Sequence, residues 1–295
     1  MSADVIVLPR PRLRGLCQAA VAMSLVGTLA AVSGVIEDYP VYGGQALRYL
    51  GGACVLFAVA RVRGLRFVRP TPRETALLTA LSLFGLVLFN VCVIEATRRG
   101  GPALVGTVLG AVPLVLALFG GRPSARLLGG AAVVAAGTVL ATGAGSGDLA
   151  GLLWSLGALG CEISFSLLAI PLLPRLGAVR VSAYSAAAAV PLLVVIGLIA
   201  DGTAMLRVPT SAEALGLGYQ GVVVTAAAFL LWYDALPRLG PGTAGLFAGL
   251  IPVGAIATGA VLGVATPSAP DLLGAALVVT GIVVGLSATA SRGPA

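Results

Sequence analysis

Histidine and lysine are missing from the 295-residue sequence, and charged residues make up only 10% of it. Without histidine, His-based triads, haem ligation through histidine and most zinc sites are excluded or improbable. Aromatic residues contribute 5%, and they do not interleave with a basic face, so the net charge of +7 does not indicate a nucleic-acid-binding protein. We predict no nucleic-acid partner, no metal and no cofactor.

Hydrophobic residues, by contrast, make up 58% of the chain, and its mean hydropathy is +1.05. A soluble domain is about 45–50% apolar and about 25% charged, so this composition leaves too little polar surface for water. The cysteines, Cys17, Cys54, Cys92 and Cys161, all fall in apolar stretches without a CxxC motif. We interpret them as small apolar side chains.

Ten segments have the roughly 20 mostly apolar residues that a transmembrane helix needs. They span about 15–36, 41–60, 75–97, 102–120, 127–143, 150–173, 181–200, 213–236, 241–263 and 271–289. The first segment is too long for a typical signal-peptide core and is interpreted as an uncleaved helix. The predicted fold is an all-α membrane protein of ten transmembrane helices.

Arginine is distributed unevenly between the loops. With the N-terminus placed inside, most arginines fall in inner loops, whereas Arg98, Arg99 and Arg207 fall in outer ones. This bias follows the positive-inside rule. It predicts a multi-pass protein of the cell (plasma or inner) membrane with both termini in the cytoplasm.

An internal repeat appears at an offset of 139 residues. Residues 95–102 align without a gap to 234–241, and the alignment continues through Gly106/Gly245 and Pro113/Pro252. The repeat predicts two five-helix units, 1–143 and 150–289, and an odd helix number turns the second upside down. Inverted repeats are a recurrent design of secondary transporters, with the substrate site near the midplane. The alternative is that duplication merely built a stable bundle.

Glu162 is an acidic residue near the middle of the sixth segment. A charge at the bilayer centre is costly, by about 2.5–3.5 kcal/mol even on the lenient scale, so we expect Glu162 to face a cavity or a partner. It is a candidate for proton coupling or cation binding. The alternative is a buried structural hydrogen bond.

Arg48 lies within the second segment and keeps its positive charge. It needs an anion, which could be Glu162, a group of carbonyls or a substrate. The alternative is that it extends toward the outer surface. Asn90 and Tyr184 are further candidates for the wall of a substrate cavity.

Two repeat-related acids precede arginines by four residues, Glu95 before Arg99 and Asp234 before Arg238. This spacing favours a salt bridge at a helix end, and the alternative is a gate contact. Pro113 and Pro252 are also repeat-related and fall within predicted helices, which they should break or kink. The freed carbonyls could line a cavity, or the prolines could simply bend the helices.

The chain resembles the EamA-type members of the drug/metabolite transporter superfamily over about residues 15–289. The resemblance rests on the second-segment sequence 46–49, on the turns at 95–113 and 234–252 that each lead to a proline, and on the Gly-rich helix ending each half. It departs from many members at 262–264, where Leu-Gly-Val replaces Leu-Gly-Glu.

The resemblance implies ten helices, cytoplasmic termini and a central cavity lined by the first four helices of each half. It also implies export of amino acids, other metabolites or drugs. Glu162 looks like a positional analogue of the membrane glutamate in the small multidrug exporters of the superfamily. We therefore predict an exporter that works by alternating access as a monomer or homodimer, with the proton as the candidate coupling ion. The rival hypothesis is a membrane enzyme acting on lipid-linked substrates.

Overall fold

The computed structural model describes residues 10–121, 123–145, 147–263 and 265–290, and all regular elements in these ranges are helical. The α-helices are α1 (Arg10–Ser33), α2 (Val41–Val62), α3 (Pro72–Ala80), α4 (Phe89–Leu109), α5 (Val112–Phe119), α6 (Ala125–Thr142), α7 (Leu149–Leu167), α8 (Leu173–Asp201), α9 (Ser211–Tyr219), α10 (Ala228–Gly245), α11 (Leu250–Val261) and α12 (Ala269–Ala290). Two π-helices, η2 (Leu81–Leu88) and η4 (Gln220–Ala227), and three 3₁₀ segments, η1 (Gly34–Ile36), η3 (Gly202–Leu206) and η5 (Leu246–Gly249), complete the set. Residues 1–9 of the predicted first repeat and Val264 of the departing turn lie outside the described ranges.

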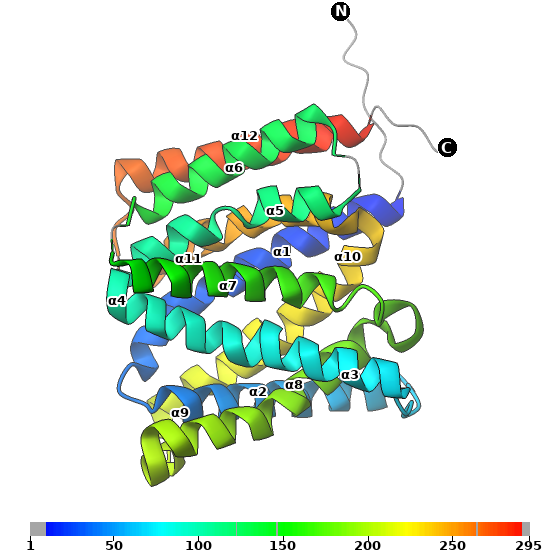
Figure 1. Cartoon of the computed structure of the whole chain (residues 1–295), viewed down its shortest axis with the longest axis vertical. Helices are drawn as coiled ribbons and strands as arrows, with labels where there is room; N and C mark the ends of the chain where they lie inside the picture. The colour runs from blue at the N-terminus through cyan, green and yellow to red at the C-terminus, as the bar shows by residue number, and fades with distance from the viewer. Residues whose placement is uncertain (1–9, 122, 146, 264, 291–295) are drawn as a thin grey trace, which may run out of the picture.

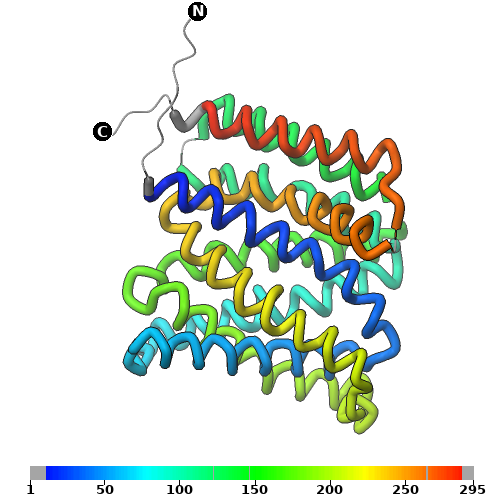
Figure 2. The backbone as a smooth tube through the Cα atoms, turned by 180° about the vertical axis from the view of Figure 1, so that it is seen from behind, coloured from blue at the N-terminus to red at the C-terminus, as the bar shows by residue number. Residues whose placement is uncertain are grey.

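The helices run side by side as a bundle (Figures 1 and 2). Within the described ranges, eight helical runs are long and apolar enough to cross a membrane. The start of α1 and the end of α12 lie at one end of the bundle, which we call the termini face (Figure 1). The turn between α1 and α2 lies at the other end, the opposite face. The protein is thus an all-helical, multi-pass membrane protein.

The structure has eight candidate spans in its described ranges, whereas the sequence predicts ten transmembrane segments. The numbers differ because some neighbouring segments join into one continuous helical run. The run Ser211–Val261 holds two predicted segments and has 51 residues. A straight helix of this length would measure about 76 Å at 1.5 Å per residue, whereas the bilayer core is about 30 Å thick. Gly240 interrupts the run with φ of 73°. Gly101, its repeat-related counterpart, has φ of 72° within the run Pro72–Leu109.

Local features recur at the same offset as the sequence repeat. The helices α3 and α9 both begin with a capping box, formed by Thr71 with Glu74 and by Thr210 with Glu213. In each box the threonine hydroxyl accepts from the glutamate N–H, and the carboxylate accepts from the threonine N–H. The π-helices that follow, 81–88 and 220–227, also match at this offset.

The largest helix contacts join the two predicted repeats, because α2 packs on α8, α6 on α12, and α1 on α11. Figures 1 and 2 both show α6 and α12 side by side. Glycines allow the backbones to approach closely. A β-carbon on Gly27 of α1 would lie 2.1 Å from the Ile251 carbonyl oxygen of α11, so the contact requires glycine there.

Polar contacts fasten both faces of the bundle. Arg175 forms an ion pair with Glu74 near the termini face, and Arg207 forms one with Glu213 near the opposite face. The Tyr184 hydroxyl donates to the Val68 carbonyl, 3.0 Å away, and the Tyr39 hydroxyl donates to the Arg207 carbonyl. Val68 and Arg207 are themselves related by the 139-residue offset. Burial raises the pKa of Tyr39, so its hydroxyl remains a donor at neutral pH.

Candidate functional site: a central cavity

A cavity of about 490 Å³ lies between the two predicted repeats. It extends from the opposite-face ends of α1 and α6, at Ser33 and Thr142, to Glu162 and Trp232 deeper in the bundle. Most of its wall is apolar, and α1, α4 and α11 provide much of it. This volume is within the range of pockets that hold small molecules.

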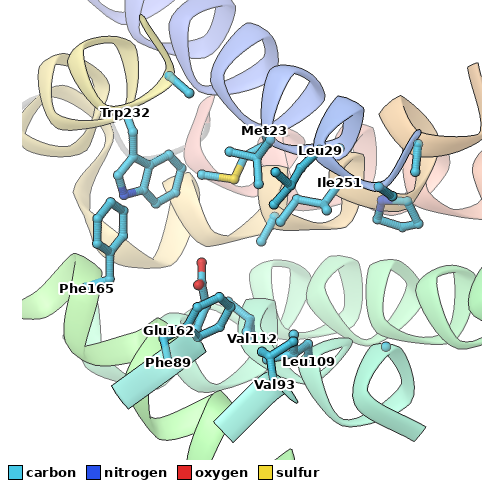
Figure 3. A pocket seen from close by; sticks show the side chains of 18 of the residues that line it. Met23, Leu29, Phe89, Val93, Leu109, Val112, Glu162, Phe165, Trp232 and Ile251 are labelled. Carbon is cyan, nitrogen blue, oxygen red and sulfur yellow. The ribbon is translucent and has the colours of Figure 1, made fainter. Parts of the chain in front are cut away.

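Glu162 reaches the cavity from the C-terminal half of α7. Figure 3 shows its carboxylate directed into the cavity, with Phe89 beside it and Trp232, Phe165 and Met23 around it. Among the described residues, none forms a hydrogen bond or an ion pair with this carboxylate. A carboxylate in apolar surroundings without a partner is unfavourable when ionised. Its charge therefore depends on what enters the cavity.

Arg48 reaches the same cavity from α2 and is only 6% exposed. Its Nε donates to the Thr225 hydroxyl at 2.9 Å and its Nη1 to the Gln45 side-chain oxygen at 3.2 Å. The guanidinium carbon lies 5.2 Å from the Tyr49 ring centre. These partners are neutral, and the ion pairs found among the described residues do not include Arg48.

Asn90 also lines the cavity, one helical turn after Leu86. Its side-chain amide donates to the Leu86 carbonyl at 2.6 Å and to the Tyr49 hydroxyl at 3.2 Å. The second bond connects α4 to α2 and fixes the Tyr49 ring on which the Arg48 guanidinium lies. Asn90 therefore supports Arg48 through Tyr49.

Aromatic rings form the deep end of the cavity. Phe165 lies 4.9 Å from Phe229 and 5.0 Å from Tyr233, measured between ring centres. The Tyr233 hydroxyl donates to the Phe165 carbonyl at 3.3 Å. Trp232 is 2% exposed and lines the wall next to this cluster. The cluster separates the cavity from the termini face.

Comparison with known proteins connects this architecture to a transporter family. Residues 149–286 match the model of the EamA-like transporter family. The uncharacterized transporter YetK of Bacillus subtilis (strain 168) is 24% identical over 291 residues, covering 94% of this chain and 88% of YetK. The chain is a membrane transporter whose second half is similar to the EamA-like family.

A solved crystal structure supports the same fold along nearly the whole chain. It superposes with a TM-score of 0.80 at 25% sequence identity, covering 92% of this chain and 98% of the other. The family match and the name of the relative indicate a transporter rather than an enzyme.

Glu162, Arg48, Asn90 and Pro252 of this transporter lie around one cavity, although the sequence separates them widely. Tyr184 requires a correction. Its hydroxyl bonds to Val68, its ring packs on Phe57 and Phe67, and it is not among the described residues that line the cavity. Tyr184 lies near the termini-face end of α8, so its side chain stays close to the surface.

The repeat-related acids of the transporter form salt bridges at helix ends. Glu95 pairs with Arg98 at 3.0 Å and with Arg99 at 4.0 Å. Asp234 pairs with Arg238 at 2.8 Å and also with Arg14 of α1 at 3.2 Å. The cross-helix partner of Asp234 is absent from the sequence prediction.

The two prolines lie close to helix starts rather than in the middle of helices. A turn at Gly110–Ala111 separates α4 from α5, and Pro113 is the second residue of α5. Pro252 is in the first turn of α11, after the 3₁₀ segment η5. A proline is well tolerated there, because the first turn has no intrahelical partners for its N–H groups.

The partners of Arg48 and the aromatic cluster are absent from the sequence-based predictions. Thr225 and Gln45 are ordinary polar residues within apolar segments, and no spacing connects Thr225 with Arg48. The aromatic cluster could have been found by its periodicity. Glu162 and Phe165 are three residues apart, as are Phe229 and Trp232, and this spacing puts each pair on one helix face.

Proposed function

We propose that this transporter exports small metabolites, such as amino acids or drugs, by alternating access through the central cavity, with Glu162 as the coupling group. The observation that carries the proposal is a carboxylate that has no hydrogen-bond or ion-pair partner among the described residues, in a largely apolar cavity of about 490 Å³. Export is the direction that the family resemblance implies.

A proton and a cationic substrate group can compete for such a carboxylate. With the cavity empty, an ionised Glu162 would lack compensation, so it favours either a proton or a bound cation. If protons enter from one side as substrate leaves, one carboxylate couples the two movements. The aromatic rings around Glu162 suit the apolar body of a substrate, and they also favour a cationic group.

Arg48 supplies the complementary group. Its hydrogen bonds to Thr225 and Gln45 hold the guanidinium without neutralising its charge. An anionic substrate group could therefore bind it in a charge-assisted way. Together, Glu162 and Arg48 favour a substrate with both charges, such as an amino acid.

The predicted architecture of ten passes in two inverted repeats supports this mechanism. The capping boxes, the π-helices and the interrupting glycines recur at one offset of 139 residues. Gly101 and Gly240 interrupt the two long runs with positive φ, and a change of direction at each would be consistent with ten passes rather than eight. The repeats then cover 1–143 and 150–289, and cytoplasmic termini agree with the arginine distribution.

The proposal is tested by transport into and out of proteoliposomes, with and without a pH gradient. A panel of radiolabelled amino acids and cationic dyes serves as probes. Wild-type protein should show flux that a pH gradient accelerates, and Glu162→Gln should lose this acceleration. Equal flux for the wild type and Glu162→Gln under a gradient would reject the coupling role.

Glu95→Gln is a matched control, because it removes a carboxylate from a helix end, where Arg98 and Arg99 hold it. It should keep the response to the pH gradient. If wild-type protein moved none of the probes in either direction, export of this class of metabolite would be wrong.

A further inference from the structure

The repeat allows one contact of the bundle to be compared with its own counterpart at the other face. We call Leu116 and Ala117 of α5, with Gly242 and Gly245 of α10, the termini seam. The offset of 139 residues relates these positions to four others. Their counterparts, which we call the opposite seam, are Ala255 and Ile256 of α11 with Ala103 and Gly106 of α4. If both faces were packed alike, both seams would be closed.

The termini seam is closed. A β-carbon on Gly245 would lie 2.8 Å from Leu116 Cβ, and one on Gly242 would lie 3.3 Å from Ala117 Cα. Leu116 is 1% exposed and Ala117 is fully buried. Small residues let helices approach at backbone distance, so this seam seals the bundle on the termini side of the aromatic cluster.

The opposite seam is open. Gly106, Ala255 and Ile256 line the cavity and are partly exposed. A β-carbon on Gly106 would meet Thr142 of α6 at 2.8 Å, and its three nearest neighbours all belong to that threonine. Three of the four positions that pack tightly at one face therefore line the cavity at the other.

The repeat-related carboxylates show the same asymmetry. Asp234 accepts a hydrogen bond from Gln18 at 2.7 Å and pairs with Arg14, so it ties α10 to α1 at the termini face. Glu95 is held by Arg98 and Arg99 of its own helix end. At the termini face, the Asp234 carboxylate therefore links two helices. At the opposite face, the equivalent carboxylate has partners, among the described residues, only within its own helix.

From this broken symmetry we infer that the termini seam and the opposite seam are the two gates of the transporter. The structure represents the state open to the opposite face, and in the other state Ala103 and Gly106 close on Ala255 and Ile256 while the termini seam separates. The inference rests on the proposed alternating access. Because the two seams are related by the repeat, each could adopt the packing that the other has. This exchange provides the two discrete states that such a switch requires.

The test uses disulfide trapping, which needs neither a known substrate nor transport. Cys17, Cys54, Cys92 and Cys161 are replaced by alanine. Ala117→Cys with Gly242→Cys then reports on the termini seam. Ala103→Cys with Ile256→Cys reports on the opposite seam. A variant with all four new cysteines is oxidised slowly in membranes, and its remaining thiols are alkylated and counted by intact mass.

Each pair should form a disulfide on its own. In the four-cysteine variant, each oxidised molecule should carry one disulfide and two alkyl groups. Molecules with both disulfides, or an opposite pair that never forms, would overturn the inference. A matched control retains Cys92 and adds Gly157→Cys across the α4–α7 contact, where a β-carbon on Gly157 would lie 3.9 Å from Cys92 Cβ. This disulfide should form together with either seam disulfide.

Single variants cover the case in which Gly242→Cys does not fold. Ile256→Cys should react readily with a water-soluble maleimide, and Ala117→Cys should be protected. Equal reaction rates would contradict the assignment of the open and closed seams. If the two seam disulfides never occur in one molecule but the protein moves no probe in liposomes, the gate assignment stands and the proposed function is rejected. If the protein moves a probe but both disulfides form in one molecule, the proposed function stands and the gate assignment is rejected.

Discussion

Arg48 shows how a single buried charge depends on neutral partners. Its Nε bonds to the Thr225 hydroxyl, which the η4 π-helix places against α2. In the run of apolar residues around it, Thr225 could pass for a packing residue, because the sequence alone does not show which helix it faces. The place of Arg48 in the cavity wall could therefore be predicted from the sequence, whereas its hydrogen-bond partners could not.

Thr225→Val should destabilise the protein, because the Arg48 guanidinium loses an acceptor where water cannot replace it. We expect a loss of about 1–3 kcal/mol, the typical cost of an unsatisfied buried polar group. Thermal unfolding in detergent measures the loss, and Thr225→Ser is the control that keeps the hydroxyl. An unchanged melting temperature for the valine variant would show that this bond is not needed.

At the scale of the element, the sequence predicts where helices lie better than how they are interrupted. Ten apolar segments follow from hydropathy, and the repeated turns near Gly101 and Gly240 follow from the aligned glycines. The π-helices at 81–88 and 220–227 are invisible to this reasoning, because both are mostly apolar and differ from an α-helix only in their hydrogen-bond register. Which helix faces meet, and hence the cavity, also depends on this register.

The capping boxes are expected to make separable contributions to stability. Thr71→Ala and Thr210→Ala should each cost about 0.5–2 kcal/mol, because the N–H of Glu74 or Glu213 loses its acceptor. Since the boxes lie near opposite faces, the effects should add in the double variant. Serine at either position should behave like wild type, and a strongly non-additive double variant would indicate coupling between the faces.

Close helix contact gives a second expectation at this scale. Gly27→Ala would bring a methyl group to 2.1 Å from the Ile251 carbonyl oxygen, so α1 and α11 would have to separate. Gly51→Ala is the matched control in α2, where a methyl group meets nothing within 4 Å. Purified Gly27→Ala should melt well below wild type, and equal melting of both variants would contradict the packing.

At the scale of the whole molecule, the arginine bias predicts the orientation in the membrane. Two exposed residues at opposite ends of the bundle can be used to test this orientation by cysteine labelling. Val62, at the end of α2, is 88% exposed, and Val208, before α9, is 83% exposed. In a cysteine-free background, Val208→Cys should react with an impermeant maleimide on intact cells. Val62→Cys should react only after permeabilisation, and the reverse pattern would invert the predicted topology.

The contact of α1 with α11, of α2 with α8 and of α6 with α12 has a consequence for biosynthesis. In each pair, one helix comes from the first half of the chain and its partner from the second. The first half therefore enters the bilayer well before its principal neighbours have left the ribosome. Its helices must wait in lipid as a loose group, and tertiary assembly is completed only when α12 arrives.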